Sequence, residues 1–259
     1  MASSARAGGT DAQLRQGGFL IGRSTPRARV ALDGQVVGEA SASGLYIIGF
    51  DRDSGPRVAL GVLPAGSSVW SQQDLSIAPV SYDIQHVDRL PPETVTPTDP
   101  AVIAHIAADR AKKAKAAASR DDADGFKDGF ILPLERPIRT SPFGVQRVLN
   151  GEPKQPHYGV DLAAPQGTPI RAPAAGLVVL AEPDMFLEGG LTMIDHGQGL
   201  ITYYLHQSRQ VVAAGERVSR YQLIGEVGMK GRATGPHLCW RMSWRGRHMD
   251  PSLLTGSAI

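Results

Sequence analysis

The chain has 259 residues, of which 42% are hydrophobic and 20% charged, and its formal net charge is +2. This composition is typical of an ordinary globular protein with room for two modest domains. Lys and Arg do not cluster beside aromatic residues, so the sequence gives no case for nucleic-acid binding. No apolar run approaches the roughly 18 residues that a membrane span needs, and we expect no span.

The N-terminus and the cysteine count bear on the compartment without deciding it. Residues 1–16 are polar and rich in Gly, Ala and Ser, and we expect them to form a disordered tail. No signal peptide is visible, because the first 23 residues contain no apolar segment of the required kind. The single cysteine excludes an intramolecular disulfide.

Residues 17–88 have the pattern of a small β-sandwich domain. In "RARVALDGQVV", Asp33 and Gly34 separate two alternating segments, which predicts a hairpin. The segments "GLYIIGFDR" and "RVALGVL" follow at short spacing with Gly and Pro between them. We find no residues for chemistry in this region and expect it to act as a spacer, as support for folding or as a contact surface for a partner.

Residues 89–124 are predicted to link two β units. A Pro/Thr-rich stretch leads to Asp99 and Pro100, which favour the start of a helix as its cap and first residue. The helix is rich in Ala and Lys and has little apolar face, so we expect few contacts between the two β units. Asp121, Asp122 and Asp124 resemble part of a calcium loop, but the rest of that motif is missing, and we interpret them as a solvated turn.

Residues 125–259 return to short alternating strands, and the candidate chemistry lies here. In residues 237–244, one set of alternate positions is apolar, while His237 and Cys239 share the other face. Side chains two apart on a strand lie about 7 Å apart at the backbone and can converge on a metal. The alternative is a strand with an incidental cysteine.

Two further segments present ligand-type residues. "PHYGVD" places His157 and Asp161 four apart in extended chain, so both are expected on one side. "ITYYLHQS" places Tyr204 and His206 on one face and apolar residues on the other. A site of His157, Asp161 and Cys239 would have the form of a catalytic zinc centre, with three protein ligands and an open position.

In their order and spacing these residues resemble the lysostaphin-type (LytM) zinc metallopeptidases, which cut peptide cross-bridges of bacterial cell walls. The family has His-x-x-x-Asp, then Tyr-x-His, then Gly-Pro-His-x-His, and this chain has "HYGVD", "YLH" and "GPHLC". Segments from "RTSPFGVQR" to "DPSLL" extend the resemblance over roughly the last half of the chain. It implies an antiparallel peptidase domain with a groove in a mainly β protein.

The resemblance also implies roles for single residues. His157 and Asp161 would bind Zn²⁺, and His206 and His237 would flank the attacking water and the scissile carbonyl. Cys239 stands where the family has its third histidine ligand. Thiolate is itself a good Zn²⁺ ligand, so we expect Cys239 to replace that histidine.

From this resemblance we expect a zinc endopeptidase that cleaves peptide stems of peptidoglycan in the periplasm or cell envelope, with a regulatory protein as a further candidate partner. The alternative is a catalytically inactive LytM-like module that binds a cell-wall amidase or the wall. The remaining side chains of interest are not expected to bind the metal, with His248 as the one spare candidate: His86, His105, His196, His248, Arg241 and Arg245.

Overall fold

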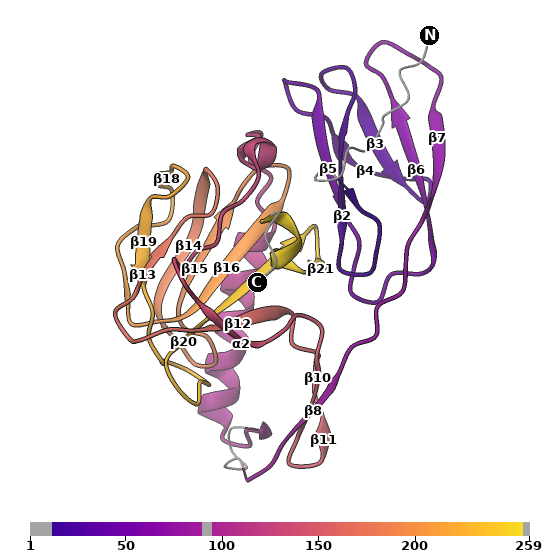
Figure 1. Ribbon diagram of the computed structural model, residues 1–259. Helices are drawn as coiled ribbons and strands as arrows, with labels where there is room; N and C mark the ends of the chain where they lie inside the picture. Colours follow the sequence, from indigo (N-terminus) through magenta and orange to yellow (C-terminus); the bar gives the residue numbers. More distant parts are fainter. Residues whose placement is uncertain (1–11, 90–94, 256–259) are drawn as a thin grey trace.

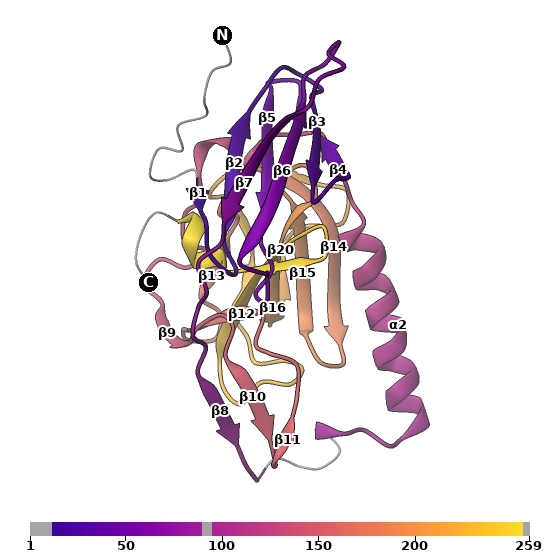
Figure 2. The ribbon, with the colours of Figure 1, turned by 90° about the vertical axis from the view of Figure 1, so that its right-hand side faces the viewer.

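The computed structural model describes residues 12–89 and 95–255, and it is mainly β, as predicted. The N-terminal β unit lies above and to the right of the C-terminal β unit (Figure 1), and the long helix runs along the C-terminal unit (Figure 2). Part of the segment expected to be disordered is ordered, because β1 (Ala12–Gln13) pairs with the next strand. Residues 14–16 are also described, and Arg15 forms a bridge with Ala78. Residues 1–11 lie outside the described residues.

The N-terminal unit consists of two antiparallel sheets, in agreement with the predicted sandwich. One sheet has the order β1, β2 (Phe19–Arg23), β5 (Leu45–Gly49). The other has the order β4 (Gln35–Glu39), β3 (Arg29–Leu32), β6 (Arg57–Leu63), β7 (Ser71–Ser76). The predicted hairpin is confirmed, since Asp33 and Gly34 join β3 to β4 with φ of 49° and 78°.

The C-terminal unit is built on an eight-stranded antiparallel sheet. Its order is β18 (Arg217–Val218), β14 (Gly176–Met185), β15 (Gly189–Asp195), β16 (Leu200–Gln207), β20 (His237–Trp244), β12 (Gly159–Ala163), β9 (Ile138–Ser141), with β21 (Arg247–Met249) also on β20. A smaller sheet of β13 (Pro169–Arg171), β19 (Leu223–Glu226) and β17 (Arg209–Gln210) accompanies it. Short 3-10 helices span Gly125–Asp128 and Pro251–Leu254.

The two faces of the large sheet have different partners. One face belongs to the main core, which includes Tyr204, Leu238 and Trp240. The other face holds a smaller apolar cluster that includes Leu205 and Cys239. Alternation along β20 therefore predicted correctly which side chains share a face, but both faces of this strand are buried.

Helix α2 (Pro100–Ala117) covers part of the second face. Asp99 caps it as predicted, accepting a hydrogen bond from the backbone of Ala101 at 2.7 Å. The helix packs beside β14 (Figure 2), and Ala116 joins the cluster that contains Cys239. No helix among the described residues is long and apolar enough to cross a membrane.

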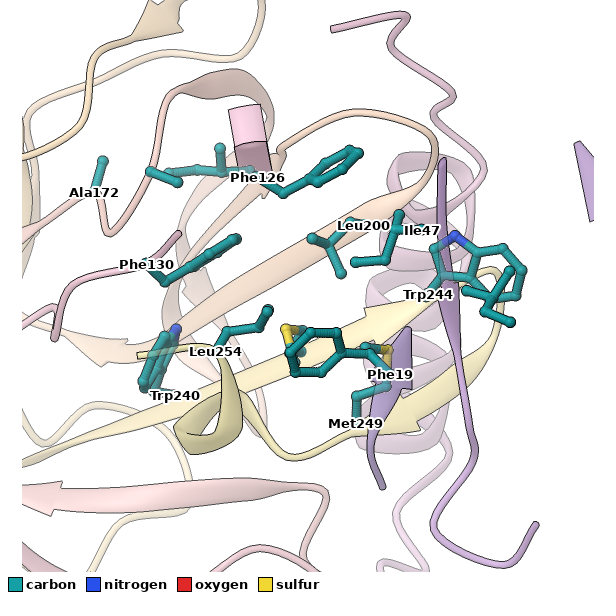
Figure 3. Packing of buried hydrophobic residues seen from close by; sticks show 14 of the residues in the cluster. Phe19, Ile47, Phe126, Phe130, Ala172, Leu200, Trp240, Trp244, Met249 and Leu254 are labelled. Carbon is teal, nitrogen blue, oxygen red and sulfur yellow. The ribbon is translucent and has the colours of Figure 1, made fainter. Parts of the chain in front are cut away.

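The expectation of few contacts between the two β units is wrong. Apolar side chains of the N-terminal unit, Phe19 and Ile47, belong to the same buried cluster as Trp244 and Met249 of the C-terminal unit (Figure 3). A Cβ added to Gly49 would lie 2.3 Å from the Met249 sulfur, which shows how closely the units meet.

The chain between the units is also attached to the C-terminal unit. Strand β8 (Ile84–Val87) pairs in parallel with β10 (Gln146–Leu149), which in turn pairs with β11 (Glu152–Pro153). The acidic segment expected to be a solvated turn instead pairs with distant residues. Asp121 contacts Arg217, and Asp122 contacts Arg27.

Candidate metal centre and catalytic histidines

His157, Asp161 and Cys239 come together in the structure. One ligand-type atom from each lies within 4.8 Å of the others, and all three residues are buried. Nε2 of His157 is 3.0 Å from Oδ1 of Asp161 and 3.3 Å from Sγ of Cys239. The strand register explains the meeting, because Asp161 on β12 lies directly opposite Cys239 on β20. Among the described residues, this is the cluster that fits a metal ion.

The donor set fits zinc, which binds imidazole nitrogen, carboxylate oxygen and thiolate sulfur. Oδ1 of Asp161 is buried and accepts no hydrogen bond from the described residues, although it faces the other two ligand atoms. Nδ1 of His157 lies 3.2 Å from the Ser141 hydroxyl and 3.4 Å from the Pro142 carbonyl, so that side of the ring is occupied. A cation between the three atoms would satisfy all of them.

Two arginines, neither of which was assigned a role from the sequence, contact the candidate ligands. Arg147 on β10 donates to Oδ2 of Asp161 at 2.9 Å. Arg241 on β20 donates from Nε to Sγ of Cys239 at 3.3 Å. Arg241, which was not expected to bind the metal, thus contacts a candidate ligand instead. Each arginine offers a positive charge to an anionic ligand.

The pKa values of the three candidate ligands, in the absence of metal, follow from burial and from these contacts. Burial lowers the pKa of His157, against the effect of Asp161. Burial alone would raise the pKa of Asp161, but His157 and Arg147 outweigh it and hold that pKa well below its usual range. Burial raises the pKa of Cys239 to about 12, although Arg241 opposes the rise. A divalent cation would favour the thiolate.

His237 and His206 lie beside this cluster. Nε2 of His237 is 3.7 Å from Oδ1 of Asp161, and the two histidine rings have centroids 4.7 Å apart. Nδ1 of His237 donates to the Gly235 carbonyl at 2.9 Å, and Nδ1 of His206 donates to the Lys230 carbonyl at 2.8 Å. In each neutral ring the proton is therefore on Nδ1, and Nε2 is free to accept a hydrogen bond or a proton. Burial, followed by the charge of His237, lowers the pKa of His206 to about 4.

His206 reaches the site by a route that alternation did not predict. Tyr204 lies in the main core, on the face of β16 opposite that of Cys239, so strict alternation would put His206 there too. The register against β15 shifts between Tyr204 and Gln207, where β16 has one residue more than its partner. His206 has φ of 65° within this bulge. A bulge of this kind re-aims a side chain, and here it turns the His206 ring toward His237.

The other histidines lie elsewhere. His248 stacks on Tyr158 with ring centroids 3.8 Å apart, and it is outside the metal-type cluster. His196 is fully buried between the Ala175 carbonyl and the Thr202 hydroxyl. His86 is exposed on β8.

A mainly apolar hollow, which Glu135 and Arg136 also line, adjoins the site. It has a volume of about 810 Å³. Pro236 and Ala163 both line it; the first precedes His237 and the second pairs with His237 across the strands. Ile138, which is 71% exposed and pairs with Ala163 across the strands, also lines it. The hollow thus continues the candidate site beyond His237.

Comparison with known proteins agrees with this geometry. The model of peptidase family M23 matches residues 155–251, the segment that contains all five site residues. Residues 155–251 are a domain of peptidase family M23. The resemblance inferred from the motifs is therefore confirmed.

Two curated relatives come from Vibrio cholerae. The peptidoglycan DD-endopeptidase ShyA is 44% identical over 95 residues, which cover 37% of this chain and 22% of ShyA. The peptidoglycan DD-endopeptidase ShyC is 40% identical over 129 residues, which cover 49% of this chain and 29% of ShyC. The chain thus spans less than a third of the length of these relatives.

A solved structure matches almost the whole chain. It is the crystal structure of a Pseudomonas aeruginosa protein assigned to peptidase family M23, at 28% identity and a TM-score of 0.74. The match covers 95% of this chain and 96% of that one, so the β unit and helix outside the M23 domain belong to the shared fold.

Proposed function

We propose that this chain is a zinc-dependent endopeptidase that cleaves peptide cross-links of peptidoglycan in the cell envelope. The observation that supports it best is the buried group of His157, Asp161 and Cys239, with two histidines whose Nε2 atoms are available. The M23 domain and the names of the Vibrio relatives point to the same class of substrate.

His157, Asp161 and Cys239 would hold the zinc, which when bound supplies a Lewis acid for the scissile carbonyl and the attacking water. His206 is neutral at pH 7 because its pKa is depressed, so its Nε2 can accept a proton from that water. His237 would face the developing oxyanion and stabilise it when its Nε2 carries a proton, and the two histidines can exchange these roles. The proton taken from water passes to the leaving amine when the peptide bond breaks.

The hollow beside His237 supports a peptide substrate. An extended peptide needs a surface on at least one side of the scissile bond, and this apolar surface begins at the residue next to His237. We propose that it receives one arm of the cross-linked peptide.

The decisive experiment measures zinc per chain in the purified protein and then the muropeptides released from digested sacculi. We expect close to one zinc per chain and conversion of cross-linked dimers to monomers. His206→Ala should keep zinc and lose cleavage, whereas His86→Ala, an exposed histidine, should keep both. Folded protein that binds no zinc and leaves dimers intact, while still binding sacculi, would support the inactive binding module instead.

A further inference from the structure

The position of His206 depends on two loops that follow other strands. The backbone N–H of His206 donates to the Glu188 carbonyl at 2.8 Å, and its ring donates to the Lys230 carbonyl. The two loops touch each other, because a Cβ added to Gly231 would lie 2.4 Å from the backbone nitrogen of Gly189. A residue with φ of 65° is strained unless its surroundings hold it, and these contacts hold His206.

The loop that carries Glu188 is attached to α2, which lies outside the M23 segment. The backbone N–H of Phe186 donates to Oδ2 of Asp109 at 2.8 Å. Lys113, one helical turn further on, forms an ion pair with the Glu188 side chain. His105, one turn before Asp109, packs edge-on against the Phe186 ring with centroids 5.9 Å apart. One face of α2 therefore contacts this short loop at three groups: the backbone N–H of Phe186, the Phe186 ring and the Glu188 side chain.

Asp109 is an unusual residue to find at such a contact. It is 4% exposed, and burying a carboxylate costs free energy unless it is hydrogen-bonded. Its partners are the Phe186 N–H and Nε2 of His105, which lies 3.5 Å away. The helix buries a carboxyl group at this point, and that group accepts the hydrogen bond from the loop.

We propose that Asp109 is a positioning residue for His206, acting through the loop of residues 186–188. Asp109 holds the Phe186 N–H, the loop presents the Glu188 carbonyl, and that carbonyl holds the His206 backbone in its left-handed conformation. Helix α2 is thus part of the catalytic apparatus, although it precedes the M23 domain in the chain. The expected effect on peptide cleavage rests on the proposed function, whereas the expected effect on the position of His206 does not.

The direct test is hydrogen exchange at the His206 amide in the full chain. Asp109→Ala removes the acceptor, so the loop should open more often and the His206 amide should exchange about tenfold faster, as expected for one lost hydrogen bond. The Ile201 amide, near the other end of β16, should keep its protection. Asp109→Asn retains an acceptor oxygen and should stay near the wild-type rate. Lys112→Ala is the matched control, because Lys112 pairs with Glu182 on β14 rather than with the loop.

A second readout concerns the reaction. Asp109→Ala should lower kcat for dimer cleavage about tenfold or more with little change in KM and unchanged zinc content, because a displaced His206 impairs only the chemical step. Asp109→Asn should restore kcat. If Asp109→Ala does not fold, Asp109→Leu, which fills the space without an acceptor, replaces it in both measurements.

Two results would overturn the proposal. One is an unchanged His206 exchange rate in Asp109→Ala or Asp109→Leu. The other is equal acceleration at His206 and Ile201, which would show general loosening of the sheet. Faster exchange at His206 alone, in a protein that cleaves nothing in any form, would keep the positional inference and reject the proposed function.

Discussion

Cys239 is buried between a metal-type cluster and an apolar one. Its exposed fraction is 1%, and it contacts both Nε2 of His157 and Nε of Arg241. With zinc, a His-Asp-Cys set has a formal charge of zero, one unit less than the His-Asp-His set of the family. Arg241 beside the sulfur and Arg147 beside Asp161 return positive charge to the site. These two contacts would stabilise the anionic forms of both ligands, which favours a working site over a decayed one.

The first prediction concerns this thiol. Cys239→Ser should lose most of the bound zinc, because a neutral hydroxyl is a poor replacement for thiolate. Cys239→His, which restores the residue type of the family, should retain it. Zinc content of the purified variants, measured by elemental analysis, distinguishes them. Equal zinc in wild type and Cys239→Ser would show that the thiol is not a ligand.

The second prediction concerns His196 and acid stability. Burial lowers the pKa of His196 to about 4, so between pH 6.5 and 4 the unfolded state binds a proton that the folded state does not. The contribution of His196 to stability is therefore complete above pH 6.5 and falls as the pH is lowered, by roughly 3 kcal/mol near pH 4.

Urea unfolding of wild type and His196→Gln at pH 7, 6, 5 and 4.5 isolates this contribution, because the other titrating groups are common to both proteins. The difference in unfolding free energy should shrink steadily below pH 6.5. A difference that is independent of pH would mean that His196 titrates normally in the folded protein.

At the scale of the element, strand alternation predicted some of the site and missed the rest. Along β20 the alternation is regular, so the shared face of His237 and Cys239 could be predicted. Along β16 the same reasoning put His206 on the face of Tyr204, which is the core face. The bulge turns the His206 side chain away from that face. It could not be predicted from the local sequence, because the residue with the positive φ is a histidine rather than a glycine. Arg147 was missed because its contact with Asp161 joins two different sheets. The contact of Arg241 with Cys239 lies along β20 itself, two positions apart, and is compatible with the alternation of that strand.

The hairpin between β3 and β4 allows a test at this scale. Gly34 has φ of 78°, and a Cβ there would meet nothing within 4 Å. Gly34→Ala should therefore lower the unfolding free energy by about 1 kcal/mol through backbone strain alone. Gly55→Ala is the matched control, since that glycine has equally open surroundings and no positive φ. Thermal unfolding of both variants checks the difference, and equal stability would show that the turn relaxes without cost.

At the scale of the whole molecule, the two β units and the capped helix could be predicted from turns, alternation and the Asp99-Pro100 pair. Their packing could not. Apolar residues that alternate on a strand indicate a buried face but not the partner that buries it. Trp244 and Met249 pack against Phe19 and Ile47, which lie about 200 residues earlier in the chain. The weak apolar face of α2 gave no sign of the ion pairs and the buried Asp109 that attach the helix to the β14–β15 hairpin.

The last prediction follows from this packing. The few contacts expected from the sequence would let a fragment of residues 125–259 fold alone, and the structure argues against this. Such a fragment would lack α2, β8 and the apolar residues that cover Trp244 and Met249, which are 2% and 0% exposed in the full chain. Exposing two large side chains costs several kcal/mol, a large share of the stability of a single domain.

We therefore expect the fragment to be recovered poorly or to melt at least 10 °C below the full chain and to bind a hydrophobic dye, since each lost kcal/mol lowers the melting temperature by a few degrees. A fragment of residues 95–259, which restores α2 but not the N-terminal unit, separates the two contributions. It should regain the protection of the His206 amide while still exposing Trp244 to the dye. If the shorter fragment melts with the full chain and binds no dye, the contacts between the two units contribute nothing to stability, and the M23 unit is independent of its surroundings.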